Sequence, residues 1–339
     1  MIHYTPQELL KHVLLGQTLT QEEAQRLFTA VIDGDLTEGQ TAALLAALRM
    51  RGETSEELAG AALAYRQAAQ PFPQQPRPIA DCVGTGGDMA GTINISTAAA
   101  LVAASIGVPV AKHGNRSVSS KSGSADLAEA LGIAIGLETQ QAAEQLSRHD
   151  FCYIFAGQYH PAIGRVMPLR RSLGVPTLLN LLGPLLNPAR PARQLLGMAR
   201  PEVTPMMAQT LTRLGHTRAL VVHGSGLDEI ALHGPTEVYE VSEEGEIDHY
   251  TLTPADLGLP EYPLSALQGG DAQENARLIR AVLEGRGEAA HRDAIAAATG
   301  ALLYLMERAP TLRGGVAQAL DHLASGQAAQ HLTRLGAPA

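Results

Sequence analysis

The chain has 339 residues, of which 45 % are hydrophobic, and a formal net charge of −9, so it is long enough for one large or two ordinary domains. Its acidic balance and its lack of Trp disfavour a nucleic-acid-binding protein. Its two cysteines, Cys82 and Cys152, lack metal-ligand spacing, and there is neither a signal-peptide pattern nor an apolar run of about 18 residues. We therefore expect a cytoplasmic protein that binds neither nucleic acid nor membranes.

Residues 1–70 are predicted to form short helices, because Thr-x-x-Glu/Gln patterns punctuate them and each pattern satisfies the free N–H groups of a helix start. The patterns begin at Thr5, Thr20, Thr37 and Thr54. Helices of this length cannot each bury an apolar face alone. They must pack together, against the rest of the chain, or against a second copy of it.

After the Pro-rich linker 71–78, short apolar strands alternate with helices, which is typical of a mostly parallel sheet flanked by helices. We expect strands at 79–83, 108–112, 151–156, 194–198 and 219–223, and helices at 96–106, 125–131, 275–283 and 293–307. The segment 161–182 is predicted as two helices separated by a glycine, and it could join the first helical group. Residues 240–248 are predicted to form a polar hairpin.

The first candidate site is the glycine loop 84–88, which follows a predicted strand and precedes a helix that starts near Asn94–Thr97. Such a loop can bind phosphate through backbone N–H groups and the helix dipole. The pattern GTGGD fits neither the dinucleotide-binding nor the Walker pattern. A tight turn without a ligand therefore remains an alternative.

A second loop, at 112–124, combines three cations with five serines, and it also follows a predicted strand. Parallel sheets bind ligands beyond the carboxyl ends of their strands, so both loops could face one site. Two phosphate-binding loops suggest a substrate with phosphates at two ends. A solvated run of charge is the alternative.

Two further features could complete such a site. Asp228 and Glu229 follow a strand and a glycine turn, where they are either ordinary turn acids or ligands of Mg²⁺ beside a polyphosphate. Arg170 lies on an apolar helix, where it either binds a carboxylate bidentately or is a surface arginine, as we expect for Arg171.

With these features together, the chain closely resembles the anthranilate phosphoribosyltransferases over essentially its whole length. The matching motifs are GTGGD (84–88), NIST (94–97), KHGNR (112–116), SSKSGSAD (119–126), YHPA (159–162), NLLGPLLNPA (180–189) and GLDE (226–229). GTGGD is shared with pyrimidine nucleoside phosphorylases, whereas KHGNR and the LGPLxNPA turn are much more specific.

The resemblance implies an α/β fold of the nucleoside phosphorylase/phosphoribosyltransferase type. A small helical domain (1–72 and about 162–190) would form the dimer interface and the anthranilate side. A larger domain (73–161 and about 191–339) would hold the mostly parallel sheet and bind 5-phosphoribosyl 1-diphosphate and Mg²⁺. The implied reaction joins the amine of anthranilate to C1 of that sugar and releases pyrophosphate, as a step of tryptophan synthesis.

The resemblance also implies site residues. The phosphoribosyl diphosphate would be held by Gly84, Gly87, Asp88, Thr92, Asn94, Ile95, Ser96, Thr97, Lys112, His113, Gly114, Asn115, Arg116, Ser117, Val118, Ser119, Ser120 and Ser124. Anthranilate would be held by Gly84, Asn115 and Arg170, with His113, Tyr159, His160 and Pro184 along its path, although His160 could equally be structural. Mg²⁺ would be held by Ser96, Asp228 and Glu229, with Asp88 as a further candidate, and no general base is assigned.

The chain departs from the family pattern at Gly157, Pro176 and Leu179, where Pro, Arg and Phe are frequent. These positions lie on the implied anthranilate side and leave the phosphate and metal motifs intact.

Two rival functions remain: a pyrimidine nucleoside phosphorylase-like enzyme, and a non-catalytic relative that binds nucleic acid.

Overall fold

The computed structural model describes residues 4–117 and 121–336. Three residues of the predicted phosphate set, Val118, Ser119 and Ser120, lie outside this description.

The N-terminal segment folds into four helices, as its capping patterns predict. They are α1 (Pro6–Leu14), α2 (Gln21–Asp33), α3 (Glu38–Arg51) and α4 (Ser55–Gln67). In each, the predicted threonine accepts a hydrogen bond from the backbone three residues on, and the Glu or Gln at that position accepts one from the threonine backbone. All four capping boxes are therefore confirmed.

The helices α2 and α4 cross closely, because Gly60 of α4 faces the backbone of α2. A Cβ atom at Gly60 would overlap the carbonyl oxygen of Gln21 and would lie 2.7 Å from the Cβ atom of Ala24. Next to this crossing, the buried Glu57 carboxylate pairs with Arg51 and accepts a 3.0 Å hydrogen bond from the backbone N–H of Leu19. The ion pair thus ties the end of α3 and the loop before α2 to α4.

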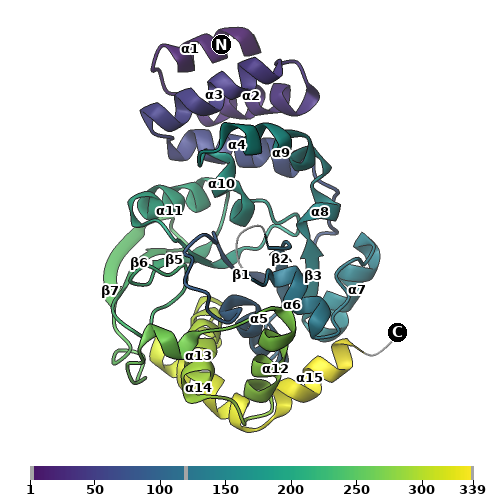
Figure 1. The fold of residues 1–339 in the computed structure, drawn as a ribbon, viewed down its shortest axis with the longest axis vertical. Helices are drawn as coiled ribbons and strands as arrows, with labels where there is room; N and C mark the ends of the chain where they lie inside the picture. The colour runs from purple at the N-terminus through teal and green to yellow at the C-terminus, as the bar shows by residue number, and fades with distance from the viewer. Residues whose placement is uncertain (1–3, 118–120, 337–339) are drawn as a thin grey trace.

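A later segment packs with these four helices, as expected for 161–182. It contains α9 (Pro161–Leu173), α10 (Leu179–Leu182) and the 3-10 turn η1 (Gly183–Leu185). Leu169, Leu178 and Leu182 of this segment share an apolar cluster with the residues of α1–α4. Figure 1 shows α9 and α10 against α4, between the N-terminal helices and the sheet.

The described residues contain one seven-stranded sheet with the order β3-β2-β1-β4-β5-β6-β7. The strands are β1 (Ala80–Gly84), β2 (Val110–Gly114), β3 (Phe151–Phe155), β4 (Arg193–Gly197), β5 (Arg218–His223), β6 (Thr236–Val241) and β7 (Ile247–Leu252). The first five are parallel, while β6 and β7 form an antiparallel hairpin at one edge. The predicted strands are confirmed to within two residues, and the hairpin predicted at 240–248 is confirmed around the turn between β6 and β7.

Helices cover the two faces of this sheet (Figure 1). The elements between and after the strands are α5 (Ile95–Ser105), α6 (Ser124–Ala130), α7 (Thr139–His149), α8 (Ala156–Tyr159), η2 (Pro201–Val203), α11 (Thr204–Arg213), η3 (Leu264–Leu267), α12 (Ala272–Leu283), α13 (Ala289–Leu305), α14 (Leu312–Ala324) and α15 (Gln327–Leu335). The Ala-rich α5 and α13 share one core with the C-terminal helices. The helix α11 packs on the other face, in the cluster that also contains the N-terminal helices.

The carboxyl ends of the parallel strands therefore point in one direction, and the predicted motif loops leave from those ends. In the described ranges, no helix is both long and apolar enough to cross a membrane.

Candidate functional site

Three acidic side chains lie near one another where the loop after β5 meets the ends of β1 and β4. They are Asp88, Asp228 and Glu229. The backbone of Gly86 donates a 2.5 Å hydrogen bond to Asp228 Oδ2. Neither Gly84 nor Gly197 has room for a side chain, because a Cβ atom at Gly84 would overlap the Asp228 carboxylate and one at Gly197 would overlap its backbone. Small residues at the ends of both strands thus let the acidic turn sit directly on the glycine loop.

Glu229 binds the helix that follows the glycine loop. Its Oε1 atom accepts a 3.0 Å hydrogen bond from the backbone N–H of Ser96, in the first turn of α5. A carboxylate at a helix N-terminus is favoured by the helix dipole. The sequence prediction that brought the glycine loop, the start of α5 and the Asp228–Glu229 pair together is therefore correct in geometry.

The acidic cluster carries more negative charge than its surroundings balance. Burial, together with the nearby charge of Asp88, raises the pKa of Asp228 to about 7. Burial and the charge of Asp228 raise the pKa of Glu229 to about 8, against the opposing effect of Lys112. Buried carboxylates that repel one another are stabilised by a bound cation.

The donor atoms here suit Mg²⁺ when a ligand completes the shell. Mg²⁺ prefers carboxylate, water and phosphate oxygens and is seldom held by protein atoms alone. Within residues 4–117 and 121–336, no group of three or more His, Cys, Asp or Glu side chains stands close enough to hold a metal ion by itself. The arrangement therefore fits a metal shared with a phosphate substrate better than a closed structural site.

Asp126 binds the described residues on either side of the serine-rich segment after β2. This carboxylate accepts hydrogen bonds from the backbone of Ser117 at 3.1 Å and of Gly123 at 2.9 Å. Burial would raise the pKa of Asp126, but these bonds and Arg116 lower it below its ordinary value. Asp126 thus organises the loop, a role that its position at the start of a predicted helix could have signalled.

Arg116 is not a free cation, contrary to the expectation from sequence. Its guanidinium donates to Asp126 Oδ1 at 3.0 Å and to both oxygens of Glu129 at 2.6 and 2.9 Å. Lys121, in contrast, is exposed and makes no ion pair in the part of the chain that the structure describes.

Lys112, which the resemblance assigns to the phosphate set, lies inside the fold in this structure. Its side chain is 1 % exposed, and its ammonium group donates to the carbonyl oxygen of Cys82 in β1. From there its charge lowers the pKa of two buried carboxyls, Asp81 and Glu229, against the larger effect of burial. Lys112 therefore balances charge beneath the site.

Asp81 and Asn187 form a polar layer under the site that sequence reasoning missed. The Asn187 amide donates to Asp81 Oδ2 at 2.9 Å and to the carbonyl oxygen of Ala111 at 2.8 Å. Asp81 in turn accepts from the backbone of Cys82 at 2.8 Å. The turn after η1 thus fastens β1 to β2, and a charged residue inside an apolar strand was the available signal.

His113 and His160 are buried together, with their Nε2 atoms 3.2 Å apart. Burial, with the neighbouring cations, lowers the pKa of His113 well below its ordinary value and that of His160 to about 4. Both rings are therefore favoured in their neutral form, and the assignment of these histidines to the anthranilate path stays a prediction. Tyr159 and Pro184 are buried as well, so the structure does not show any of these four side chains lining an open path to the site.

The remaining predicted residues divide into exposed and internal positions. Gly87 and Asp88 lie in the open loop, and Thr92 forms an isolated bridge with Gln268. The side chains of Ile95 and Thr97 are fully or almost fully buried, so any contact of these two residues with the phosphates would be made by their backbone groups. Asn94 bonds to Ser122 and Asn275, and Ser124, beside Gly114, bonds to Tyr153 at 2.7 Å.

Arg170 and Asn115 come from different layers of the molecule. Arg170 lies on α9 with the helical group, half-buried, and its guanidinium has the Met167 sulfur at 3.8 Å as its neighbour. Asn115 follows β2, is exposed, and binds the backbone of Arg116 through its Oδ1 atom. Among residues 4–117 and 121–336, no hydrogen bond or ion pair joins the two, and none pairs Arg170 with an acid.

The three departures from the family pattern lie in different surroundings. A Cβ atom at Gly157 would lie 2.9 Å from the ring of Phe155, so the small residue fits this aromatic neighbour. Pro176 is exposed, whereas Leu179 is buried in the helical cluster. Next to Pro176, the backbone of Thr177 donates to Asn180 Oδ1 at 3.0 Å and fixes the start of α10.

The helical bundle, the α/β domain and the acidic, glycine-rich site at the strand ends belong to a chain of the glycosyl transferase family. The helical bundle domain of the glycosyl transferase family matches residues 7–69, and its a/b domain matches residues 76–329.

Comparison with individual proteins narrows this class. The chain is 50 % identical over 326 residues to the anthranilate phosphoribosyltransferase of Idiomarina loihiensis, covering 96 % of both chains. It is also 50 % identical to that of Corynebacterium glutamicum, covering 94 % of this chain and 92 % of the relative. The crystal structure of the Thermus thermophilus anthranilate phosphoribosyltransferase matches with a TM-score of 0.92 and 46 % identity, covering 97 % of this chain and 98 % of that one.

The chain therefore belongs to the anthranilate phosphoribosyltransferase family. A further structural neighbour, at 27 % identity and a TM-score of 0.88 over 97 % of this chain and 96 % of that one, is the Saccharomyces cerevisiae enzyme in complex with phosphoribosyl diphosphate (PRPP) and Mg.

Proposed function

We propose that this protein transfers the phosphoribosyl group of 5-phosphoribosyl 1-diphosphate to the amine of anthranilate and releases pyrophosphate. The observation that carries the proposal is the Asp228–Glu229 pair, which lies against the glycine loop and the start of α5. The pKa values of both carboxyls are raised, so a bound cation would stabilise their ionised forms. The open glycine loop beside them could bind a diphosphate. The identity of the sugar substrate and of the acceptor is inferred from the family to which the chain belongs.

Asp228, Glu229 and the Ser96 hydroxyl are proposed to hold Mg²⁺, with Asp88 as a further ligand. The metal would neutralise the charge that develops on the departing diphosphate. Ionised carboxylates are needed for this, and Lys112 favours the ionised form of Glu229 from below. The hydrogen bond from Ser96 keeps the Glu229 carboxylate at the helix start.

The phosphates are proposed to bind the backbone N–H groups of the glycine loop, the start of α5 and the serine loop that Asp126 organises. Fixed donors of this kind stabilise charge without reorganising during the reaction. Because Lys112 and Arg116 are engaged elsewhere, the exposed Lys121 is the proposed cationic contact.

Anthranilate is proposed to bind with its carboxylate on Arg170 and with Asn115 and Gly84 near its ring. An arginine without an acidic partner suits a carboxylate ligand, and burial already lowers its pKa. The aromatic amine is unprotonated at neutral pH, so orientation at C1 supplies much of the rate. We assign no general base.

A homodimer is proposed as the working form. The exposed apolar side chains of Leu14 and Leu15 at the end of α1, and of Met50 in α3, suggest a surface that a second copy of the chain covers.

A cytoplasmic location is also proposed, because the free thiols of Cys82 and Cys152 suit a reducing compartment. The reaction would serve tryptophan synthesis.

The decisive experiment follows the fluorescence of anthranilate in the presence of phosphoribosyl diphosphate and Mg²⁺. Its loss should require all three components together with the protein. A parallel assay with a pyrimidine nucleoside and inorganic phosphate tests the rival phosphorylase. Turnover in that assay and none in the first would overturn the proposal.

A further inference from the structure

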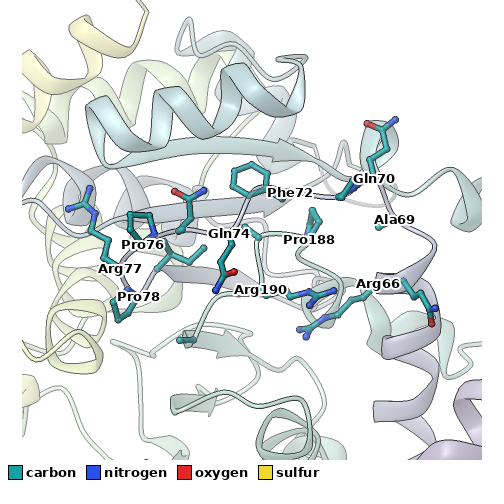
Figure 2. A pocket seen from close by; sticks show the side chains of 16 residues that line it. Arg66, Ala69, Gln70, Phe72, Gln74, Pro76, Arg77, Pro78, Pro188 and Arg190 are labelled. Carbon is teal, nitrogen blue, oxygen red and sulfur yellow. The ribbon is translucent and has the colours of Figure 1, made fainter.

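A cavity of about 720 Å³ lies away from the acidic cluster, between the two chain segments that connect the helical group to the sheet. Residues 66–79 run from the end of α4 to β1, and residues 188–192 run from η1 towards β4. Its volume is within the usual range of small-molecule sites. Figure 2 shows the side chains that line it.

The lining of this cavity has a one-sided charge. Three arginines and four glutamines contribute to it, and no aspartate or glutamate does. The glutamines are Gln67, Gln70, Gln74 and Gln75, and the remaining lining residues are proline, alanine, Phe72 and Ile79. For a protein with a net charge of −9, a cavity without acidic residues is a notable local imbalance.

Two of the arginines, Arg66 and Arg190, lie close enough in the lining to repel one another. Figure 2 shows the side chains of Arg66 and Arg190 directed towards each other. Arg66 donates through Nε to the carbonyl oxygen of Leu185. No ion pair involves Arg66 or Arg190 in the described ranges 4–117 and 121–336. The third, Arg77, is paired with Asp150.

The two arginine side chains repel one another when no anion lies between them. Burial and the charge of Arg190 lower the pKa of Arg66 to about 10. Arg190 also adopts a positive φ of 50°, which is uncommon for a side chain of its size, and its backbone N–H donates to the carbonyl oxygen of Asn187 at 3.1 Å. The turn therefore holds Arg190 at the cavity despite repulsion from Arg66.

We propose that this cavity is a second anion site, which binds a phosphate group between the guanidinium groups of Arg66 and Arg190. A planar guanidinium matches phosphate oxygens bidentately, and two of them match a dianion. Gln74 adds an amide donor to the same lining. The phosphate can come from inorganic phosphate or from a phosphorylated sugar, since both present the same group.

The site would link the two parts of the molecule. Arg66 belongs to the last turn of α4, whereas Arg190 lies three residues before β4. An anion held by both would join the helical group to the sheet across the connecting segments. It would do so without touching Asp228 or Glu229.

The test uses the full-length protein and the Arg190→Gln variant, with Arg77→Gln as the matched control. Arg77 lines the same cavity but already has an acidic partner. Titration calorimetry with inorganic phosphate, and separately with glucose 6-phosphate, compares the two sources. We expect at least one of them to bind, and its affinity for the cavity to fall roughly 10- to 100-fold in Arg190→Gln and to stay within about twofold in Arg77→Gln.

Crystals soaked in the tighter-binding ligand locate it. Density between Arg66 and Arg190 that disappears in Arg190→Gln supports the proposal. Density confined to the glycine loop, or an affinity and stoichiometry unchanged by Arg190→Gln, overturns it, as does the absence of binding at millimolar concentration. Activity with anthranilate in Arg190→Gln is measured alongside, so that failure of this site is distinguished from failure of the proposed reaction.

Discussion

At the scale of single residues, Arg170 is a half-buried cation whose guanidinium has few partners in the protein itself. It has no acidic partner in the described residues, and the Met167 sulfur is its neighbour. Replacing it by Ala should remove a charge-assisted contact to anthranilate of about 1.5–3 kcal/mol. We expect the KM for anthranilate to rise roughly 10- to 100-fold in steady-state assays with both substrates varied.

Arg171→Ala is the control for that prediction, because Arg171 is an exposed neighbour on the same helix. It should leave both KM values unchanged. If Arg170→Ala weakened phosphoribosyl diphosphate and left anthranilate untouched, the proposed division of the site would be wrong.

The acidic pair gives the second prediction at this scale. The variant Asp228→Asn with Glu229→Gln keeps the shape of the cluster but removes its charge, so turnover should fall at least 1,000-fold if the metal provides several kcal/mol. EDTA should stop the unaltered enzyme, and added Mg²⁺ should restore it. Full activity of the double variant at saturating Mg²⁺ would remove the metal role of these residues.

The buried histidines predict how stability depends on pH. Because the pKa of His160 is about 4 in the folded protein, the unfolded chain binds its proton first as the pH falls below about 6.5. The contribution of His160 to the free energy of unfolding is therefore fully present at neutral pH and is lost as the pH falls from about 6.5 to about 4. His160 alone should account for about 2 kcal/mol of unfolding free energy lost at pH 5 relative to pH 8.

Urea unfolding at both pH values measures this loss. In His160→Gln the difference between the unfolding free energies at pH 8 and pH 5 should shrink by that amount. An equal pH dependence in the variant and the unaltered protein would contradict the prediction. His113 adds in the same direction, since its pKa is also lowered.

At the scale of elements, the crossing of α2 and α4 depends on the absence of a side chain at Gly60. Gly60→Ala should destabilise the protein by about 1–3 kcal/mol, because the helices would have to separate. Gly39→Ala, in the first turn of α3 where nothing lies within 4 Å of the new Cβ atom, should instead be neutral or stabilising by up to about 1 kcal/mol. Chemical denaturation of the two variants measures the contrast.

The elements were largely predictable because their signals are local. Each capping box lies within four residues, and each parallel strand is a short apolar run, so both can be recognised without knowing the fold. The helices α7, α11, α14 and α15 were not predicted individually, although each has an amphipathic pattern in its sequence.

The direction of side chains within the site was less predictable, for a physical reason. Lys112 and Arg116 are close in sequence and alike in charge, yet one points inward to Cys82 and the other binds α6. Those directions are decided by partners that are distant in sequence or that lie on the following helix. Thr97 was assigned by motif alone, and only the packing of α5 shows that its side chain is internal.

At the scale of the whole molecule, the exposed leucines of α1 and Met50 of α3 predict self-association. Light scattering should give a mass near twice the 35.6 kDa of one chain. Met50→Asp, at a position that is 89 % exposed, should shift the protein towards monomer. Met89→Asp, at an equally exposed position just after the glycine loop, should not shift it. A monomer at micromolar concentration in the unaltered protein would contradict the prediction.

The helical group is assembled from two separate stretches of chain, since α9 and α10 pack in the same apolar cluster as α1–α4. A recombination event that exchanged only the N-terminal stretch between two relatives would therefore create a mismatched core. Inherited variation in the two stretches should then be coupled, although more than 90 residues separate α4 from α9. Anyone grafting the bundle of one relative onto another would have to move both stretches at once.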